Sequence, residues 1–443
     1  MNLKRLDILL AGDEDFLEDL PDRTETTFSS KVLDLLRRVT RVTDIVSPRL
    51  GIVLLATHAA IAGYSVAVVN NVLSSPLSRL RFALLLRLRR PRAVGISTVA
   101  MRRTETTAQI VATARRLCPG AAIILGGQNA VQTPATRKLA DLTVTGHGEN
   151  VLLRLLGELK AGRPLASMDG VHKDENGSPI LKGDPYYGAE GGTQLPDWGF
   201  TTSSNKVIPV EGSRGCWHSC AFCTTSNQGR QVFRKPADVL REALNDVRKF
   251  GARQLHFVDS SFTCSKEFID EFLRLLAESG EKFRWSCFSR VDDFTAQPGL
   301  PGRMARAGCI LSYLGIESVH DDILERMRKG YVRKTIAEGL SNLEGLNVYG
   351  NFIVGFPGDT EEKVKDTVAF IERFQFDKVS IAPLYVPPQL YAQARAKPEL
   401  YCHLRGKSEF EWEHDTMNRA RAVELADWAR KTLNKHKGRT FAY

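Results

Sequence analysis

Short apolar runs alternate with amphipathic stretches through the first 160 residues of the chain. Brief apolar runs bounded by small or polar residues are typical of buried parallel strands, and amphipathic stretches of ten or more residues are typical of helices. We expect strands at residues 6–11, 65–70, 93–97, 122–125 and 142–145, with helices between them. This alternation predicts an α/β domain over residues 1–160, in which helices cover both faces of a doubly wound parallel sheet.

The same alternation resumes after residue 205 and continues to residue 390. We expect a helix at residues 236–250 and six strands at residues 207–210, 254–258, 284–289, 311–314, 351–354 and 378–382. Strands that alternate with helices in this number fit a partial (β/α)6 barrel of the TIM type over residues 206–390.

Two further segments complete the predicted organisation. Residues 161–205 are rich in Gly and Pro, which indicates a linker, and contain a hairpin-type turn at Asp174-Glu-Asn-Gly177-Ser-Pro. Residues 391–443 predict a small, mainly helical C-terminal segment whose helix runs from about residue 415 to residue 435.

Composition limits the classes of protein that fit. The chain has 443 residues, of which 43% are hydrophobic and 25% charged, and this balance is typical of a soluble globular protein. It shows no long uncharged apolar run, hence no transmembrane segment, and no signal peptide. Eight cysteines are too few for a disulfide scaffold of this length, so we expect a cytoplasmic protein.

The formal net charge of +10 raises the question of anionic partners. The densest basic runs, residues 79–92 and 431–439, contain few aromatic residues, whereas single-stranded nucleic acids are bound by interleaved aromatic and basic side chains. A nucleic-acid partner is therefore not favoured. Residues 79–92 predict an amphipathic helix that has a solvated basic face and ends at Pro91, and weak association with a membrane surface is an open alternative.

The sequence Cys216-Trp-His-Ser-Cys220-Ala-Phe-Cys223 carries the most specific chemical signal. Three thiolates in this spacing can hold an iron–sulfur cluster, whereas a structural zinc site needs a fourth Cys or His from a second pair. The chain contains no second CxxC pair. A disulfide or three unrelated buried thiols are the alternatives to a cluster.

This CxxxCxxC spacing, with Phe222 before the third cysteine, resembles that of radical S-adenosylmethionine (SAM) enzymes. The resemblance implies a [4Fe-4S] cluster held by Cys216, Cys220 and Cys223, with SAM bound to its open iron. It extends to polar and glycine-rich strand ends, where a (β/α) barrel places its site. The residues that would contact SAM are Phe222, Asp259, Ser260, Arg290, Glu317, Ser318, Ile353 and Gly355.

The resemblance gives these strand-end residues separate roles. Asp259 and Ser260 would face the methionine part of SAM, Arg290 its carboxylate, and Glu317 with Ser318 its amino group or ribose, while the backbone near Ile353 and Gly355 would lie along adenine. A guanidinium can form two hydrogen bonds to a carboxylate, which supports the assignment of Arg290. A plain ion pair is the alternative for Arg290 and Glu317.

Small residues at the strand ends of the first block resemble the N-terminal, Rossmann-like cobalamin-binding domain of many radical SAM enzymes. A flat corrin can lie on a sheet edge only where the backbone carries little side chain. The matching residues are Ser97, Thr98, Gly126, Gly127, Gly146, His147, Gly148 and Glu149. The Asp-x-His-x-x-Gly element that supplies a histidine to cobalt is absent, because residues 11–16 read Ala-Gly-Asp-Glu-Asp-Phe.

Together these features resemble a cobalamin-dependent radical SAM enzyme. The resemblance implies methylation of an unactivated carbon of a metabolite, natural product or peptide through a 5'-deoxyadenosyl radical and methylcobalamin. It also implies an external electron donor such as flavodoxin or ferredoxin. A radical rearrangement, cyclisation or oxidation is the alternative reaction, and a cobalamin- or redox-sensing protein is the alternative outside enzymes. The sequence names no catalytic residue beyond the cofactor-binding positions.

Overall fold

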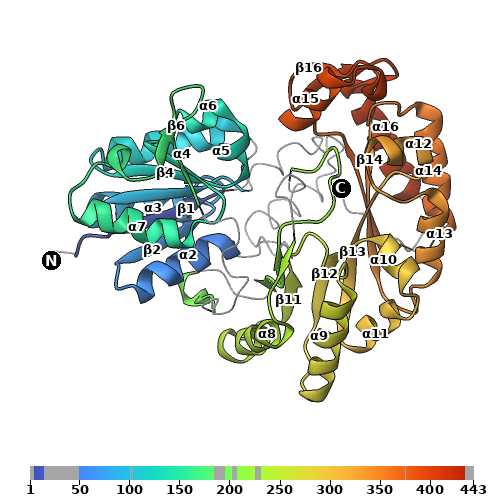
Figure 1. The fold of residues 1–443 in the computed structure, drawn as a ribbon, viewed down its shortest axis with the longest axis horizontal. Coiled ribbons are helices and arrows are strands. Elements are labelled where there is room, and N and C mark those ends of the chain that lie inside the picture. The colour runs from blue at the N-terminus through green and yellow to red at the C-terminus, as the bar shows by residue number, and fades with distance from the viewer. Residues whose placement is uncertain are drawn as a thin grey trace, which may run out of the picture. The chain divides into compact units, whose positions relative to one another are not determined.

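The computed structural model describes residues 4–13, 49–99, 101, 103–183, 195–201, 207–224, 231–374 and 376–434. The chain divides into two compact units, residues 1–209 with 250–252 and residues 210–249 with 253–443. Each unit is built around one largely parallel sheet (Figure 1). The predicted α/β fold with parallel sheets is therefore confirmed.

The first unit contains a seven-stranded sheet in the order β2-β1-β3-β4-β5-β7-β6. All neighbouring pairs run parallel except β6 with β7, which are antiparallel. Its first five strands are β1 Ile8–Gly12, β2 Val66–Asn70, β3 Ala93–Ser97, β4 Ala122–Gly126 and β5 Leu142–Thr145. The chain leaves β1 to form β2 on one side and then crosses to β3 on the other, so the sheet changes direction between β1 and β3. Ligands of such sheets bind beyond the carboxyl ends of the strands at that point.

Alternation along β1 explains why helices cover both faces of this sheet. Ile8 and Leu10 pack with α2 (Leu50–Ile61) and α7 (Glu149–Lys160) on one face. Leu9 and Ala11 point to the other face. The helices that contribute to that second core are α3 (Pro76–Arg89), α4 (Thr104–Leu117) and α5 (Gln128–Gln132). A short helix, α6, spans Pro134–Arg137.

The segment predicted as a linker, residues 161–205, instead adds structure to the first sheet. Its elements are the 3-10 helix η2 Leu165–Ser167, β6 Val171–Lys173, β7 Pro179–Lys182 and the 3-10 helix η3 Trp198–Phe200. Asp174 accepts a hydrogen bond from Ser178 N–H and pairs with the buried Arg137 (2.7 Å), while Gly177 takes the positive φ of the turn (+79°). The predicted turn is present, and it joins two paired strands. Residues 184–194 and 202–206 lie outside the described part of the chain.

The second unit contains a six-stranded sheet in the order β15-β14-β13-β12-β11-β8. The strands are β8 Val207–Val210, β11 Gln254–Phe257, β12 Trp285–Ser289, β13 Cys309–Glu317, β14 Val348–Val354 and β15 Lys378–Pro383. Pairs from β11 to β15 are parallel. All six predicted strands are thus present, and β13 and β14 begin two or three residues earlier than expected.

Helices follow the strands of the second sheet in sequence. They are α8 Pro236–Phe250, α9 Lys266–Glu278, α10 Val291–Ala296, α11 Leu300–Arg306, α12 Asp321–Arg326, α13 Arg333–Ser341, α14 Glu361–Arg373 and α15 Pro388–Ala396. A two-strand ribbon joins β9 (Ser213–Arg214) to β10 (Val232–Phe233). Among the described residues, no helix is long and apolar enough to span a bilayer.

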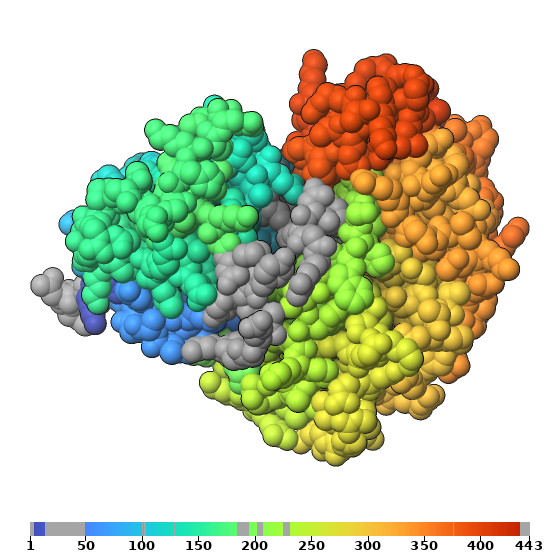
Figure 2. All heavy atoms as spheres, viewed as in Figure 1, coloured from blue at the N-terminus to red at the C-terminus, as the bar shows by residue number. Residues whose placement is uncertain are grey.

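The C-terminal segment differs from the mainly helical prediction. A 3-10 helix, η5 (Glu399–Tyr401), is followed by a three-stranded antiparallel sheet formed by β16 Arg405–Ser408, β17 Glu411–His414 and β18 Met417–Asn418. The predicted helix is α16 (Arg419–Asn434), which packs on α14, β14 and β15. This segment lies against the orange elements of the second unit (Figure 2). In β17, exposed Glu411 and Glu413 alternate with buried Trp412 and His414, as expected for a strand. The sequence prediction interpreted this aromatic-rich stretch as a loop.

Trp285 offers a direct test of the second core. Its side chain is buried, its Nε1 donates to Ala307 O (2.9 Å), and its ring packs against Phe257 and Phe272. We expect Trp285→Ala to destabilise the protein by about 3–5 kcal/mol. Thermal unfolding of this variant should show a lower melting temperature, whereas Trp428→Ala, at a half-exposed position, should melt near wild type. Equal losses in the two variants would contradict this packing.

Candidate active site

The three cysteines lie in a loop that follows β8, at the carboxyl edge of the second sheet. Cys220 is buried, and Cys216 and Cys223 are half-buried. Main-chain groups anchor the loop, since Ala221 N–H donates to Met327 O (3.0 Å) and the Gln389 amide donates to Cys223 O (3.2 Å). The loop is therefore attached both to the end of α12 and to α15.

Electrostatics show that the thiols are close to one another and to two cations. Burial raises the pKa of Cys216 and of Cys220, and repulsion from Cys223 adds to both shifts. Arg290 and Lys329 act in the opposite direction on the pKa of both thiols. These two cations favour the thiolate forms that metal ligation requires.

The cysteines do not form a site for a single metal ion. Among the described residues, no three Cys, His, Asp or Glu side chains converge as ligands of one ion would. In a [4Fe-4S] cluster each cysteine binds a different iron atom, so the sulfur atoms stand farther apart than ligands that share one ion. The donor set of three thiols beside two cations fits such a cluster.

The buried Lys329 and the half-buried Glu317 form a pair beside the cysteine loop. Lys329 Nζ is 4.0 Å from Glu317 Oε1 and donates to Gly315 O (2.8 Å). The same ammonium lies over the ring of Phe222, 5.9 Å from its centroid. Glu317 has φ +70°, a strained value for a residue with a side chain, and such strain clusters at functional sites. Burial raises the pKa of Glu317, while Lys329 and Arg290 lower it.

Arg290 is held by the protein rather than left open. Its Nε and Nη2 donate to the two oxygens of Asp292 at 2.9 Å, and Nη2 also donates to Lys329 O (2.6 Å). Its guanidinium lies over the Tyr331 ring. Two nitrogens of Arg290 are thus engaged in hydrogen bonds within the protein. Lys329, which the sequence did not indicate as a site residue, lies over Phe222 of the cysteine loop. Of the expected alternatives for Arg290, the ion pair is the one that the structure displays.

His218, between the first two cysteines, is neutral at physiological pH. Burial lowers the pKa of its imidazole to about 4, and repulsion by Arg290 contributes to this shift. A neutral imidazole adds no further positive charge to the loop.

Asp259 follows β11 and anchors the chain that leads into the cysteine loop. Gly212 N–H donates to its Oδ2 (3.0 Å), and Ser213 Oγ donates to its Oδ1. Gln231 donates in turn to Ser213 Oγ (2.7 Å) and accepts from Cys264 Sγ (3.2 Å). The carboxyl of Asp259 is therefore bound to the protein backbone at the base of the loop.

The carboxyl of Asp259 should make stability depend on pH. Burial raises the pKa of Asp259 to about 7, so the folded state holds its proton at pH values where the unfolded chain has lost it. The resulting stability is full below about pH 4 and is lost as pH rises through 7. We expect the melting temperature of Asp259→Asn relative to wild type to rise by a few degrees as pH is raised from about 4 to about 8. Thermal melts across this range test the effect, and a constant difference would contradict it.

The remaining predicted SAM residues lie at neighbouring strand ends. Ser260 is exposed after β11, and the Ser318 hydroxyl accepts from His320 N–H (3.2 Å) at the start of α12. Ile353 is half-buried on β14. Gly355 has φ +89°, and an added Cβ would lie 2.5 Å from the ring of Trp412, so the close approach of that ring requires glycine here.

Asp359 holds the turn after β14. Its Oδ2 accepts from Gly355 N–H (2.8 Å), and burial raises the pKa of this carboxyl to about 6. The Gly355–Asp359 turn is thereby fixed by its own side chain.

In the first unit, Ser97, Thr98, Gly126 and Gly127 meet at the carboxyl edge of β3 and β4. The Thr98 hydroxyl donates to Gly126 O (2.9 Å) and accepts from Ala130 N–H (3.0 Å), so it binds these two loops together. Gly127 has φ +103°, and an added Cβ would lie 2.8 Å from Val99 N. By contrast, the nearest atom to a Cβ on Gly126 is 3.9 Å away.

The loop after β5 contains the other four residues expected to contact cobalamin. Gly146 has φ +79° and lies against Gly183 O, and His147 and Gly148 are half-buried. Glu149 is buried as the first residue of α7. Residues 14–16, part of the segment in which the histidine element is absent, lie outside the described residues.

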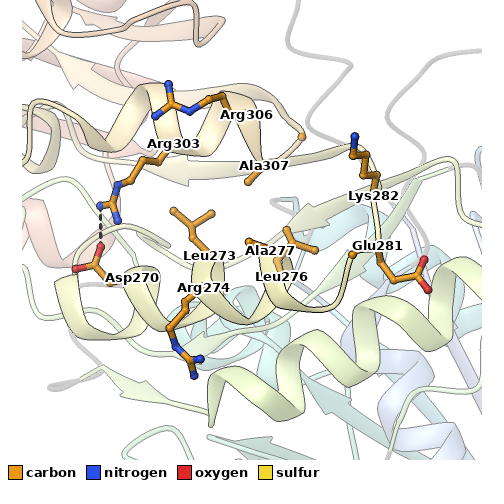
Figure 3. Close-up of a pocket in the computed structure, with 12 residues that line it drawn as sticks. Asp270, Leu273, Arg274, Leu276, Ala277, Glu281, Lys282, Arg303, Arg306 and Ala307 are labelled. Atoms are coloured by element: carbon orange, nitrogen blue, oxygen red, sulfur yellow. Dashed lines mark ion pairs between the residues drawn. The ribbon is translucent and has the colours of Figure 1, made fainter.

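A separate pocket lies at the amino ends of β12 and β13, away from the cysteine loop (Figure 3). Leu273, Leu276 and Ala277 of α9 form its apolar wall. The ion pair between Arg303 and Asp270 (2.7 Å) spans one end. Because sites of parallel (β/α) sheets lie at the carboxyl ends of the strands, this pocket is not the candidate active site.

Sequence reasoning missed Lys329, Tyr331 and the Ser213–Gln231 contact. The run Arg328-Lys-Gly-Tyr331 follows a short helix, and both Arg328 and Gly330 have positive φ. A basic residue beside a glycine just after α12 was the available signal, but such pairs are common at helix ends.

Comparison with known proteins agrees with this geometry. Residues 210–371 match the model of the Radical SAM superfamily. The uncharacterized methyltransferase PH0819 of Pyrococcus horikoshii is 28% identical over 81% of each chain. The bacteriochlorophyllide d C-12(1)-methyltransferase of Chlorobaculum tepidum is 28% identical over 60% of this chain, which spans 58% of that protein's length.

Solved structures of other proteins share the fold over most of the chain, and one of them illustrates the likeness. It is the radical SAM methyltransferase TsrM from Kitasatospora setae with cobalamin and a [4Fe-4S] cluster bound, at a TM-score of 0.67 and 16% identity, covering 88% of this chain and 78% of TsrM. The chain therefore carries a radical SAM domain, which implies SAM and a [4Fe-4S] cluster as cofactors, and methyltransferases are among its relatives.

Proposed function

We propose that this enzyme is a cobalamin-dependent radical SAM methyltransferase that methylates an unactivated carbon of a small metabolite or natural product. The first unit, with β6 and β7 included, would be the cobalamin-binding domain. The six-stranded sheet of the second unit would form a partial (β/α)6 barrel that holds the cluster and SAM. The names of the methyltransferase relatives support the reaction class.

The strand ends of the first sheet are the observation that carries the cobalamin assignment. Gly12, Ser97, Gly126 and Gly146 end or follow four adjacent strands, on both sides of the point where the strand order reverses. A broad, flat ligand can lie on a sheet edge only where the strands end in small residues. Asn70 Oδ1, at the end of β2, is buried without a hydrogen-bond partner among the described residues, and the amide groups of a corrin are suitable donors for it.

Residues of the second unit have defined tasks in this proposal. Cys216, Cys220 and Cys223 hold the cluster. Lys329 supplies a cation for the SAM carboxylate, and Glu317 supplies an anion for the SAM ammonium group. Lys329 Nζ and Glu317 Oε1 are 4.0 Å apart, which is longer than a hydrogen bond, so each can bind the opposite charge of a zwitterionic ligand. When bound, the cluster supplies the electron that cleaves SAM to a 5'-deoxyadenosyl radical, and cobalamin supplies the methyl group.

Burial of this pair suits the binding of a zwitterion, because the exclusion of water strengthens the electrostatic contacts that both side chains can make. Lys329 is 5% exposed and lies over the rings of Phe222 and Tyr331, and the side chain of Glu317 is 13% exposed. An external donor such as flavodoxin or ferredoxin would deliver the electron.

Product analysis tests the proposed reaction. The reconstituted enzyme is incubated anaerobically with SAM, cobalamin, a strong reductant and a panel of candidate substrates. Methyl transfer of this type forms 5'-deoxyadenosine and S-adenosylhomocysteine together with a methylated product. Formation of 5'-deoxyadenosine alone across the panel would contradict methyl transfer and favour a rearrangement, cyclisation or oxidation.

A further inference from the structure

Helix α3 carries leucines on its solvent-facing side. Leu77 is 80% exposed, Leu80 57%, Leu84 46% and Leu88 56%. The predicted amphipathic helix is present, but its exposed face is apolar and not simply basic. Single exposed leucines are common on protein surfaces, whereas four on one side of a helix form a continuous apolar patch.

The stripe is continuous because of its spacing. At 3.6 residues per turn, Leu77, Leu80, Leu84 and Leu88 fall within about 80° of the helix circumference. Phe82 and Leu86 lie on the opposite side and are buried in the core of the first unit. The helix therefore has two apolar faces, and the core accounts for only one of them.

Arginines border the leucine stripe. Arg81 falls on one side of it and Arg87 on the other, while Arg79, Arg89 and Arg90 lie near the helix ends. No Asp or Glu occurs in the sequence from residue 45 to residue 104. Residues 45–104 thus place positive charge around the stripe and contribute no acidic side chain to it.

We propose that α3 docks on the surface of an anionic lipid bilayer, with the leucine stripe in the acyl region and the flanking arginines at the lipid headgroups. An apolar stripe between basic side chains is the arrangement of helices that lie in the membrane interface. A second copy of the chain fits less well, because pairing two α3 helices would bring arginine against arginine. This docking is independent of the proposed methyl transfer.

Vesicle flotation of the full-length reconstituted protein tests the proposal. We expect it to float with vesicles of phosphatidylcholine and phosphatidylglycerol and to bind far less to phosphatidylcholine alone. The triple variant L80S/L84S/L88S should lower the bound fraction at least about fivefold, because it removes most of the apolar stripe. The pair R81Q/R87Q should weaken binding to the anionic vesicles only. Ile61→Ser, at a 63% exposed position on α2, is the matched control and should bind as wild type.

Two results would overturn the proposal. One is failure of the wild type to float with anionic vesicles, and the other is flotation of the triple variant equal to that of the wild type. In the second case, a changed molecular mass of the triple variant by light scattering would make the stripe a contact between copies of the chain. Melting curves of all variants establish that they are folded.

Discussion

Cys220→Ser is expected to abolish SAM cleavage, lowering 5'-deoxyadenosine formation at least about a hundredfold. Cys220 is buried between Cys216 and Cys223, and the cations Arg290 and Lys329 favour its thiolate. A serine hydroxyl at this site stays protonated and cannot replace a thiolate as an iron ligand. The variant should also hold much less iron after reconstitution, as measured by metal analysis and by the absorbance of the cluster.

Cys402→Ser is the matched control for this change. Cys402 is half-buried in the turn after η5, outside the cysteine loop. Its variant should keep iron and SAM cleavage near wild type. Full cluster content and activity in Cys220→Ser would contradict the assignment of the cluster to the three cysteines.

Lys329→Met is expected to weaken SAM binding about tenfold or more, which corresponds to about 1.4 kcal/mol. The substitution keeps the length of the side chain but removes the ammonium that lies 4.0 Å from Glu317 and over Phe222. Without this cation, burial raises the pKa of Glu317 further, so its carboxyl takes up a proton and loses its charge for the SAM ammonium group. Equilibrium binding of SAM to the reconstituted variant measures the effect.

Two further variants separate a local role from a general loss of charge. Lys365→Met removes an exposed lysine of α14 that pairs with Glu361, and should leave SAM binding unchanged. Lys329→Arg keeps the positive charge and should retain more affinity than Lys329→Met. An unchanged dissociation constant in Lys329→Met, with the cluster fully loaded, would show that Lys329 does not contact SAM.

Hydrophobic patterning predicted the two sheets well because their strands are buried and short. The expected strands at residues 93–97, 142–145 and 207–210 have the observed bounds. Periodicity was less useful where pairing depends on distant residues. Strands β6 and β7 are three and four residues long, and the side chain of Arg137, far away in sequence, anchors their turn through Asp174. The hairpin-type turn at residues 174–177 was a local signal, but the glycine-rich segment around it did not indicate that the flanking residues form strands of the first sheet.

The site was predicted in part for a related reason. Cysteine spacing is a local signal, and the strand predicted at residues 207–210 placed the cysteine loop at the carboxyl edge of the sheet, where the structure has it. Lys329 reaches Glu317 through a tertiary contact, so the sequence indicated a charged strand end but not that Lys329 would face Glu317. Asp292 lies only two residues from Arg290, and the sequence offered an ion pair for Arg290 without naming this partner. The same limit applies to α3, where the pattern predicted the helix but not which of its two apolar faces the core covers.

The metal content of the protein tests the central proposal most directly. The chain is purified anaerobically, reconstituted with iron and sulfide in the presence of hydroxocobalamin, freed of unbound cofactor, and analysed for iron and cobalt together with its ultraviolet–visible spectrum. We predict about four irons and about one cobalt per chain. Iron without cobalt would contradict the role of the first unit in binding cobalamin and would leave a radical SAM enzyme that performs another reaction.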